Sequence, residues 1–498
     1  MNYIKFSNKF LLAFLAVSIF SACTDLETEE KDSIVVEGED GTFQAGNPSE
    51  LLIASYKNLG AFTDQANIYA LYEQPSDEMI PPTRGVDWGD NGVWRTLHAH
   101  TWDPTHSWVT NTWNQLNERA FKCNEILASN PSAQEAAEAK FLRAFYTFHV
   151  MDLFGQVPFR DVNEGVNVNP KVLTRAEAFD FIIKDLTEAL PALPNSGPAA
   201  INSKATQSAA NALLARLYLN KGVYTAAAPA GPYTFDAADM AKVIEYADKV
   251  TAAGYSLEDD YFTNFTTAAT KEIILTSPEG TPQNRWFMTL HYNQDPSGWN
   301  GFTTLAEFYD KFEDGDQRKG KVTLKDGTKF AGIDRGFLIG QQYKDNGDPI
   351  TDTRSQQPLK FTRDIVLAGA ATDKGIRAIK YHPADAGQYI LLRYADVLLM
   401  KAEAQLRSGK AADALATVNA LRAKRGAKAL GAIDEKGMLD ERGRELYWEG
   451  LRRIDQIRFG TWDDTWTEKT VTEAFRVLYP IPQRALDSNP NLKQNEGY

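Results

Sequence analysis

The stretch YILLRYADVLLMKAEAQLRSGKAADALATVNALRAKRG, residues 389–426, predicts two consecutive amphipathic helices. The first carries apolar side chains at the three- and four-residue steps of one helix face, at Leu391, Tyr394, Leu398, Ala402 and Leu406, and closes at Gly409. A second face follows almost at once, formed by Ala411, Leu415, Val418 and Leu421. Two helices joined by a glycine-containing turn form an antiparallel hairpin. We expect Ala402, Gly409 and Ala414 to supply the small side chains that close helix packing needs.

Similar patterns occur earlier in the chain. ANALLARLYLNKGVYTAA, residues 210–227, has the same character, and its second helix is predicted to resume near Asp239 after an insertion. Another helical run, with Phe141, Phe145, Phe148 and Met151 on one face, ends at Gly155 and Pro158. These units resemble degenerate tetratricopeptide repeats. The fold class predicted is therefore mainly α, with tetratricopeptide-like helical hairpins.

Two segments break the helical pattern. Residues 62–110 and 258–385 are rich in Gly, Pro, Asn, Asp, Thr and aromatic residues. We expect large loop-rich insertions there, with short helices and a few short strands. Long loops in a compact domain are usually functional or disordered, and the aromatic content favours function. The sequence predicts a single domain at 47–498, with an N-terminal part at about 47–257 and a C-terminal part at about 258–498.

The N-terminus predicts export and lipidation. Lys5 and Lys9 precede a short apolar stretch, Phe10–Phe20, and then Ser21-Ala22-Cys23. That stretch is too short to cross a bilayer, so residues 1–22 are predicted to be a signal peptide. Cys23 is the predicted lipidation site, although secretion without lipid remains an alternative. The acidic, polar residues 23–46 are predicted to form a flexible tether.

The acidic balance restricts the partners of the chain. The formal net charge is −13, and the sequence has no basic stripe. Nucleic acids and polyanionic ligands are poor matches because phosphate contacts need clusters of Lys and Arg. Neutral ligands remain open.

The sequence predicts that the protein is not an enzyme and has no metal site and no cofactor. It leaves open whether calcium orders the loops. It contains no H-E-x-x-H, G-x-S-x-G or P-loop pattern. His98, His100 and His106 lie close together, but we interpret them as hydrogen-bonded structural residues. DNGD at 345–348 lacks the spaced ligands of a calcium loop, and a turn is expected.

Tryptophan is the informative residue type. Five of the ten tryptophans fall between Trp88 and Trp113, and Trp88 sits in the polar loop RGVDWGDN, residues 84–91. A second group lies within 284–302, with Trp286, Tyr292 and Trp299. An exposed indole covers the apolar face of a sugar ring, while Asp, Asn and Arg bond its hydroxyls. Trp94 and Trp102 are predicted to be loop anchors and Trp113 a core residue; for Trp88 and Trp299 both the anchor and the platform role remain open.

Four segments together resemble the SusD/RagB family of outer-membrane lipoproteins of Bacteroidetes. They are residues 138–159, 389–426, 441–460 and 479–498. We interpret the third, ERGRELYWEGLRRIDQIRFG, as one ion-paired helix in which Glu449 and Arg453 are four residues apart. The resemblance implies a helical scaffold that faces a SusC-like TonB-dependent transporter and a loop-rich side that binds a glycan. On this basis the glycan-binding residues are predicted to be Arg84, Asp87, Trp88, Asn91, Trp286, Tyr292 and Trp299.

The function expected from this resemblance is noncatalytic capture of oligosaccharides at the extracellular face of the outer membrane. Two alternatives remain. In one, the same fold imports peptides or glycoprotein fragments. In the other, the chain is a glycoside hydrolase that uses loop carboxylates such as Asp77 and Glu78.

Overall fold

The computed structural model describes residues 43–164, 167–280 and 286–498. The predicted signal peptide, Cys23 and the predicted tether up to residue 42 lie outside these ranges. The principal helices are α2 (Pro48–Lys57), α3 (Asn67–Glu73), α4 (Val93–His98), α5 (Ser107–Ala128), α6 (Ala133–Phe154), α7 (Arg175–Ala189), α8 (Gln207–Leu219), α9 (Lys221–Tyr224), α10 (Ala237–Ala252), α11 (Ala306–Tyr309), α12 (Tyr394–Arg407), α13 (Ala411–Lys424), α14 (Glu435–Leu446), α15 (Arg452–Arg458) and α16 (Gln483–Ser488). Within the described part of the chain, none of the helices combines the length and apolar character needed to span a bilayer.

Most of the short strands lie in the loop-rich segment 258–385. They are β1 (Val157–Phe159), β2 (Lys171–Leu173), β3 (Ile273–Thr276), β4 (Gly320–Lys321), β5 (Arg335–Leu338), β6 (Gly340–Gln341), β7 (Thr351–Asp352), β8 (Gln357–Pro358), β9 (Lys360–Phe361), β10 (Arg377–Ile379) and β11 (Ile390–Arg393). All pair antiparallel, in the orders β1-β2, β10-β5-β4, β11-β3, β6-β9 and β7-β8. The predicted class, mainly helical with loop-rich insertions and few short strands, is confirmed.

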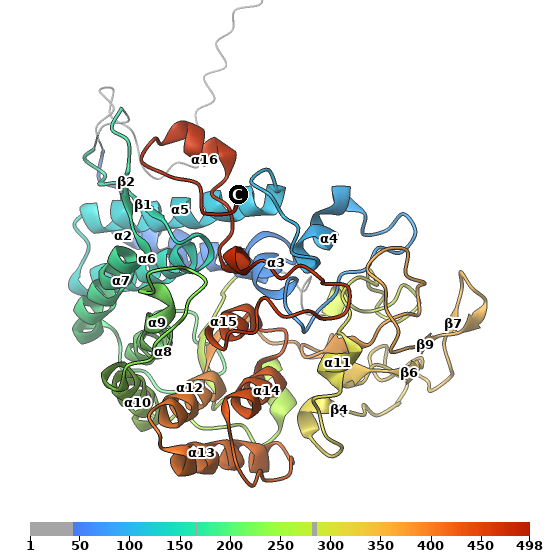
Figure 1. Cartoon of the computed structure of the whole chain (residues 1–498). Coiled ribbons are helices and arrows are strands. Elements are labelled where there is room, and N and C mark those ends of the chain that lie inside the picture. The colour runs from blue at the N-terminus through green and yellow to red at the C-terminus, as the bar shows by residue number, and fades with distance from the viewer. Residues whose placement is uncertain (1–42, 165–166, 281–285) are drawn as a thin grey trace, which may run out of the picture.

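Helix α6 is the centre of the N-terminal bundle and packs against both α5 and α7 (Figure 1). It begins with a capping box in which Ser132 and Glu135 each satisfy a backbone N–H of the other. It ends at Gly155, which has a φ of 72°. A left-handed residue here suits glycine because other side chains strain in this conformation. The predicted helix and its end are confirmed.

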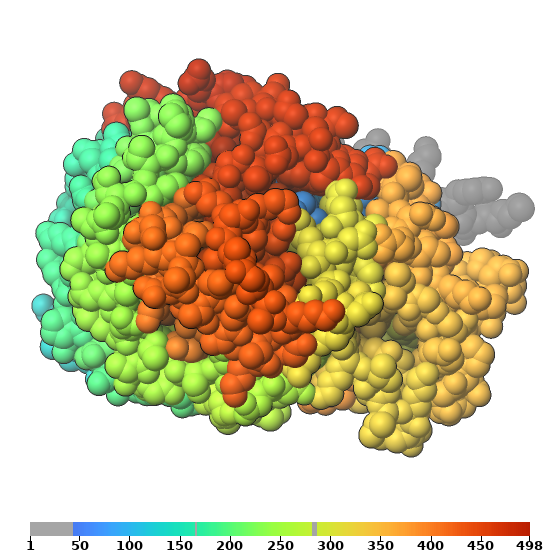
Figure 2. Space-filling model, turned by 60° about the horizontal axis from the view of Figure 1, so that its bottom comes forward, coloured from blue at the N-terminus to red at the C-terminus, as the bar shows by residue number. Residues whose placement is uncertain are grey.

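The two predicted hairpins form a continuous helical layer. α10 packs against both α8 and α12, and α12 packs against α13. Figure 2 shows the orange α12–α14 region between the green α8–α10 region and the yellow and light-orange loop-rich part. Ala402 and Ala414 are fully buried in the α12–α13 contact, as expected. α12 begins at Tyr394, however, because Leu391 belongs to β11.

Gly409 was expected to allow close helix packing, but the structure gives a different reason for glycine at this position. A Cβ on Gly409 meets no atom within 4 Å, so close packing does not demand glycine there. Its φ is 75°, in the left-handed region. Glycine is needed to reverse the chain between α12 and α13.

The predicted single helix at 441–460 is also wrong, because the chain breaks it. α14 ends at Leu446 and α15 begins at Arg452, and between them Trp448 and Gly450 have φ values of 59° and 71°. The predicted pair of Glu449 with Arg453 does not form. Glu449 instead binds Arg393, and Arg453 binds Asp152 at 2.6 Å.

Charged side chains of this region lie inside the protein. The Glu445 carboxylate is bound by Arg318 at 3.2 Å, Arg393 at 2.9 Å and Arg425 at 2.8 Å. These guanidinium groups outweigh the effect of burial and hold the pKa of Glu445 well below its usual range. The network joins α13 and α14 to β11 and to the chain before β4. It therefore connects the helical layer to the loop-rich part.

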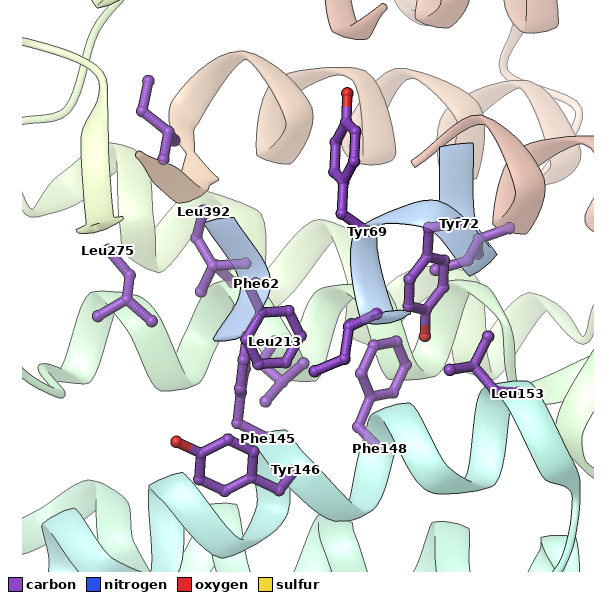
Figure 3. Close-up of a cluster of buried hydrophobic side chains, with 14 of the residues drawn as sticks. Phe62, Tyr69, Tyr72, Phe145, Tyr146, Phe148, Leu153, Leu213, Leu275 and Leu392 are labelled. Atoms are coloured by element: carbon purple, nitrogen blue, oxygen red, sulfur yellow. The ribbon is translucent and has the colours of Figure 1, made fainter. Parts of the chain in front are cut away.

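An aromatic cluster is buried in the hydrophobic core between α3, α6 and α8. Figure 3 shows Phe62 among residues from α3, α6 and α8. The Phe62 ring centroid is 5.2 Å from that of Phe145 and 4.7 Å from that of His149. The Tyr72 hydroxyl hydrogen-bonds His149 Nδ1 at 2.8 Å. Phe62 lies three residues before Gln65, one of the residues that line the hollow described next.

Candidate functional site

The loop-rich surface contains an aromatic hollow of about 460 Å³. We name it the aromatic hollow; its lining residues are Gln65, Ala66, Asp87, Trp88, Asp90, Trp94, Trp108, Tyr292 and Trp299. Its size is within the range of small-molecule sites, roughly 300–1,000 Å³. Three segments distant in sequence meet here. Four of the seven residues predicted to bind glycan, Asp87, Trp88, Tyr292 and Trp299, therefore line one site.

Trp88 is held firmly by its surroundings. Its Nε1 donates to the backbone carbonyl of Trp299 at 2.8 Å, and its ring centroid lies 5.1 Å from that of Trp94. A Cβ added to Gly301 would come within 2.0 Å of Trp88 Cζ2. Only glycine at 301 leaves room for the indole in this position. Trp88 is half-buried, so the ring serves as an anchor and as a wall of the hollow.

Trp299 is the most open ring of the hollow. Its side chain is 48% exposed, although it packs on Phe287 with centroids 5.0 Å apart. The exposed part of this indole is flat, apolar surface that a ligand can cover. A ring that is supported on one side and exposed on the other is suited to stacking against a ligand.

Asp87, Tyr292 and Arg354 form a polar triad at the edge of the hollow. The Tyr292 hydroxyl donates to Asp87 Oδ2 at 2.7 Å, and Arg354 Nη1 lies 3.1 Å from the same oxygen. The Arg354 guanidinium also lies over the Tyr292 ring, 4.2 Å from its centroid. The hydrogen bond from Tyr292 lowers the pKa of Asp87, while burial and Asp87 raise the pKa of Tyr292 to about 12. At neutral pH the triad presents a carboxylate and a neutral phenol.

The other three predicted glycan-binding residues do not line the aromatic hollow. Arg84 is only 2% exposed, and its guanidinium donates to the backbone carbonyls of Asn300 (2.7 Å), Lys374 (2.8 Å) and Ala371. It braces the loops behind the site. Trp286 packs against a separate cluster around Leu290 and Phe361, and Asn91 borders a neighbouring hollow.

Trp94, Trp108 and Arg354 are among the residues at the site that had no predicted binding role. Trp94 is buried, as expected of an anchor, and donates from Nε1 to Asp90 Oδ2 at 2.6 Å, yet one side of its ring lines the hollow. Trp108 packs edge-on against Trp94 at 4.2 Å. The position of Trp108 in the tryptophan-rich segment could have indicated its place at the site. No feature of the sequence indicated Arg354, because it reaches the site from a loop more than 50 residues beyond Trp299.

Of the clustered histidines, His98 and His100 make structural hydrogen bonds. His98 hydrogen-bonds the carbonyls of Met79 and Thr467, at 3.0 and 2.9 Å, and His100 bonds that of Pro75 at 2.7 Å. Within residues 43–164, 167–280 and 286–498, no group of three or more His, Cys, Asp or Glu is placed to hold a metal ion. The DNGD segment forms the expected turn, closed by Lys344 N–H to Asp348 O at 2.8 Å.

The carboxylates Asp77 and Glu78 are engaged in structural bonds. Asp77 accepts two hydrogen bonds from Arg452, at 2.6 and 2.8 Å. Glu78 is fully buried and accepts from the Trp448 backbone N–H at 3.0 Å. Neither residue lines the aromatic hollow.

A second, mostly apolar hollow of about 360 Å³ lies between α5, α6 and β1. Phe121, Phe159 and Phe181 are among its lining residues. It contains none of the residues predicted to bind glycan.

The chain belongs to the SusD/RagB family. A family model described as "SusD family" matches residues 259–498, and a second, described as "Starch-binding associating with outer membrane", matches residues 51–219. The starch-binding protein SusD of Bacteroides thetaiotaomicron is 26% identical over 86% of this chain and 84% of its own length.

Solved structures share the fold. A SusD-like protein from Bacteroides fragilis superposes with a TM-score of 0.69 at 22% identity, covering 91% of this chain and 96% of that one. A laminarin-binding SusD-like protein gives a TM-score of 0.65 at 22% identity, covering 91% and 99%. Surface glycan-binding protein A from Bacteroides fluxus gives 0.67 at 22% identity, covering 91% and 100%.

Proposed function

We propose that this protein captures neutral oligosaccharides in the aromatic hollow at the bacterial surface and passes them, uncleaved, to a SusC-like TonB-dependent transporter. The observation that carries the proposal is the half-exposed indole of Trp299 beside Trp88, Tyr292 and the carboxylate of Asp87. The C–H face of a sugar ring stacks on an indole, while its hydroxyls donate to carboxylate oxygens and bond the phenol. The site offers both groups within one hollow.

The charges at the site favour a neutral ligand. Among the described residues that line the aromatic hollow, Asp87 and Asp90 are acidic, and no lining residue is Lys or Arg. Arg354 lies nearby but is already paired with Asp87. An acidic or sulfated sugar entering the hollow meets carboxylates that repel it, and the net charge of −13 acts in the same direction.

The relatives support this cargo and location. Their names describe binding of starch, of laminarin and of surface glycans, and one matching family model is described as associated with the outer membrane. Cys23, directly after the predicted signal peptide, supplies the proposed lipid anchor on the extracellular face. The resemblance to the SusD/RagB family supports the proposed transporter partner.

The chemistry of the hollow favours binding over hydrolysis. A glycoside hydrolase needs a carboxylic acid with a raised pKa beside a second carboxylate. The pKa of Asp87 is instead lowered, so this group is ionised and cannot donate a proton near neutral pH. Incubation with soluble starch and laminarin is expected to produce no new reducing ends; reproducible turnover contradicts the proposal.

Affinity electrophoresis tests the binding site directly. Gels containing soluble starch, laminarin or alginate are compared with a gel without polysaccharide. We expect at least one neutral glucan to retard the wild type and alginate to have no effect. Trp299→Ala should lose the retardation, whereas Trp286→Ala, which removes an indole outside the hollow, should keep it.

Two results contradict the proposal. Unchanged retardation of Trp299→Ala removes the platform role of this ring. Failure of every neutral glycan on an array, together with peptides that co-purify with the protein, favours the peptide cargo instead.

A further inference from the structure

A polar hollow of about 560 Å³ adjoins the aromatic hollow. We name it the polar hollow; its lining residues are Asp90, Asn91, Val93, Thr96, Thr101, Trp102, Asp103, Thr105, His106, Ser107 and Trp108. Asp90 and Trp108 line both hollows. The two are therefore adjacent, with the Trp108 ring at their boundary.

The two hollows differ in chemistry. In addition to Trp108, four indole or phenol rings line the aromatic hollow. The polar hollow is lined mainly by hydroxyl, amide and carboxylate side chains. None of the described side chains that line the polar hollow is Lys or Arg. Such a surface offers mainly hydrogen bonds to a neutral, hydroxyl-rich group.

His106 in the polar hollow has an unused hydrogen-bonding atom. The residue is only 8% exposed, and its Nε2 lies 3.2 Å from the Val93 carbonyl. Because a carbonyl only accepts, Nε2 carries the hydrogen and Nδ1 is an acceptor. Nδ1 is buried and has no partner in the part of the chain that the structure describes. Buried polar atoms are normally bonded, so an incoming hydroxyl donor is a fitting partner.

Asp103 adds a second acceptor that is already oriented. Its Oδ1 accepts from the Thr105 backbone N–H at 2.7 Å and from the Thr105 hydroxyl at 2.6 Å. These bonds fix the carboxylate in the loop before α5, and they lower the pKa of Asp103. The exposed amide of Asn91 supplies donors at the same hollow.

We propose that the polar hollow is a second subsite, in which His106, Asp103 and Asn91 hydrogen-bond the hydroxyls of sugar units beyond those stacked in the aromatic hollow. The inference rests on the proposed function and deepens it, because it specifies the ligand class. That class is a neutral, linear oligosaccharide long enough to pass Trp108 and occupy both hollows. Affinity then rises with chain length until both are filled.

Isothermal titration with two size series tests this. The probes are the maltose-to-maltoheptaose series and the laminaribiose-to-laminariheptaose series. We expect the wild type to bind the heptasaccharide of at least one series at least tenfold more tightly than its disaccharide. Asp103→Ala removes an acceptor, and Ser107→Phe fills the polar hollow from an exposed position. Both variants should lose most of the gain with length and bind the disaccharide within about twofold of wild type.

Matched variants separate the possible outcomes. Ser196→Phe places the same ring on an exposed loop away from both hollows and should keep the wild-type length dependence. If Asp103→Ala and Ser107→Phe also keep it, the second subsite is refuted while the aromatic hollow stands, provided that Trp299→Ala abolishes binding of every length. A wild type that binds neither series refutes the proposed ligand class at both hollows. Melting temperatures identify any variant that fails to fold; if one does, the other decides.

Discussion

The indole Nε1 of Trp88 donates a 2.8 Å hydrogen bond to the backbone carbonyl of Trp299, which joins two segments 211 residues apart in the chain. The ring of Trp88 thereby supports the backbone of the more exposed Trp299. Neither ring is positioned by its own loop alone. The two tryptophans therefore differ in their surroundings, since Trp88 links two loops of the hollow and Trp299 is the more exposed ring.

Replacing Trp88 by Ala should lower both stability and glycan binding. The ring is half-buried against Trp94 and Phe302, so we expect a loss of about 2 kcal/mol in the free energy of unfolding, less than the 3–5 kcal/mol of a fully buried tryptophan. Trp299→Ala should stay within about 1 kcal/mol of wild type, because its ring is half-exposed. Urea denaturation and affinity electrophoresis measure the two effects. Equal stability of Trp88→Ala and wild type contradicts the anchor role.

A single methyl group at Gly301 should disturb the hollow. The Cβ of Gly301→Ala meets Trp88 Cζ2 at 2.0 Å, so the indole must move away. We expect a cost of about 1–3 kcal/mol in stability and weaker retention by a neutral glucan. Gly431→Ala is the control, because a Cβ there meets nothing within 4 Å. Wild-type binding by Gly301→Ala would show that the Trp88 position is not critical.

The buried pair Glu73 and Glu78 should make stability depend on pH. Glu73 accepts from the Gly450 N–H at 2.8 Å, and burial raises its pKa from the usual 4.5 to about 7. Between these values the unfolded chain loses its proton while the folded protein keeps it. Stability therefore falls as pH rises from about 4.5 to 7, by roughly 3 kcal/mol for this group.

Glu73→Gln tests this dependence. The variant should lose less stability than wild type between pH 4.5 and 7.5, measured by urea denaturation. The difference between the two proteins is the relevant quantity, because buried His291, with its pKa lowered to about 4, titrates in the opposite sense. Carboxylates with lowered values, such as Glu441 at about 2, act only below this range. Parallel curves for the two proteins rule out titration of Glu73.

Removing the proposed lipid site should release the protein from the membrane. Cys23→Ala in the full chain should abolish palmitate incorporation and move the protein from the outer-membrane fraction to the soluble fractions. Metabolic labelling and fractionation measure both. Cys123→Ala is the control for the second cysteine, which lies buried in α5. Labelling of Cys23→Ala that equals wild type contradicts lipidation at this residue.

The hairpins were predictable because helix periodicity is local. The spacing of Phe141, Phe145 and Phe148 places them on one face whatever surrounds them, and Gly155 ends that helix through its own backbone preference. The break at Trp448 was not predictable in this way. The alternation of charges at 441–460 suits a surface helix, but these side chains pair with residues such as Arg393 and Asp152 that lie far away in the chain.

The residues predicted to bind glycan show the same division. Residue type, loop context and the family resemblance together predicted Trp88, Tyr292 and Trp299 as members of one site, but they predicted Trp286 as well, which lies outside the hollow. They did not distinguish Arg84 from Arg354. The guanidinium of Arg84 donates to backbone carbonyls behind the site, whereas Arg354 pairs with Asp87 at its edge. Both are arginines in polar loops, and only their neighbours separate them.

By itself the sequence determined the helical class and the kinds of side chain available to a ligand, because periodicity, turn residues and residue chemistry act over a few neighbouring positions. The resemblance of four segments indicated the family. Only the tertiary structure decided which of those side chains meet. Trp299 and Trp88 are joined by a bond across 211 residues, and Trp286, thirteen positions before Trp299, faces another cluster. Such contacts depend on how distant segments pack, and no local pattern encodes that.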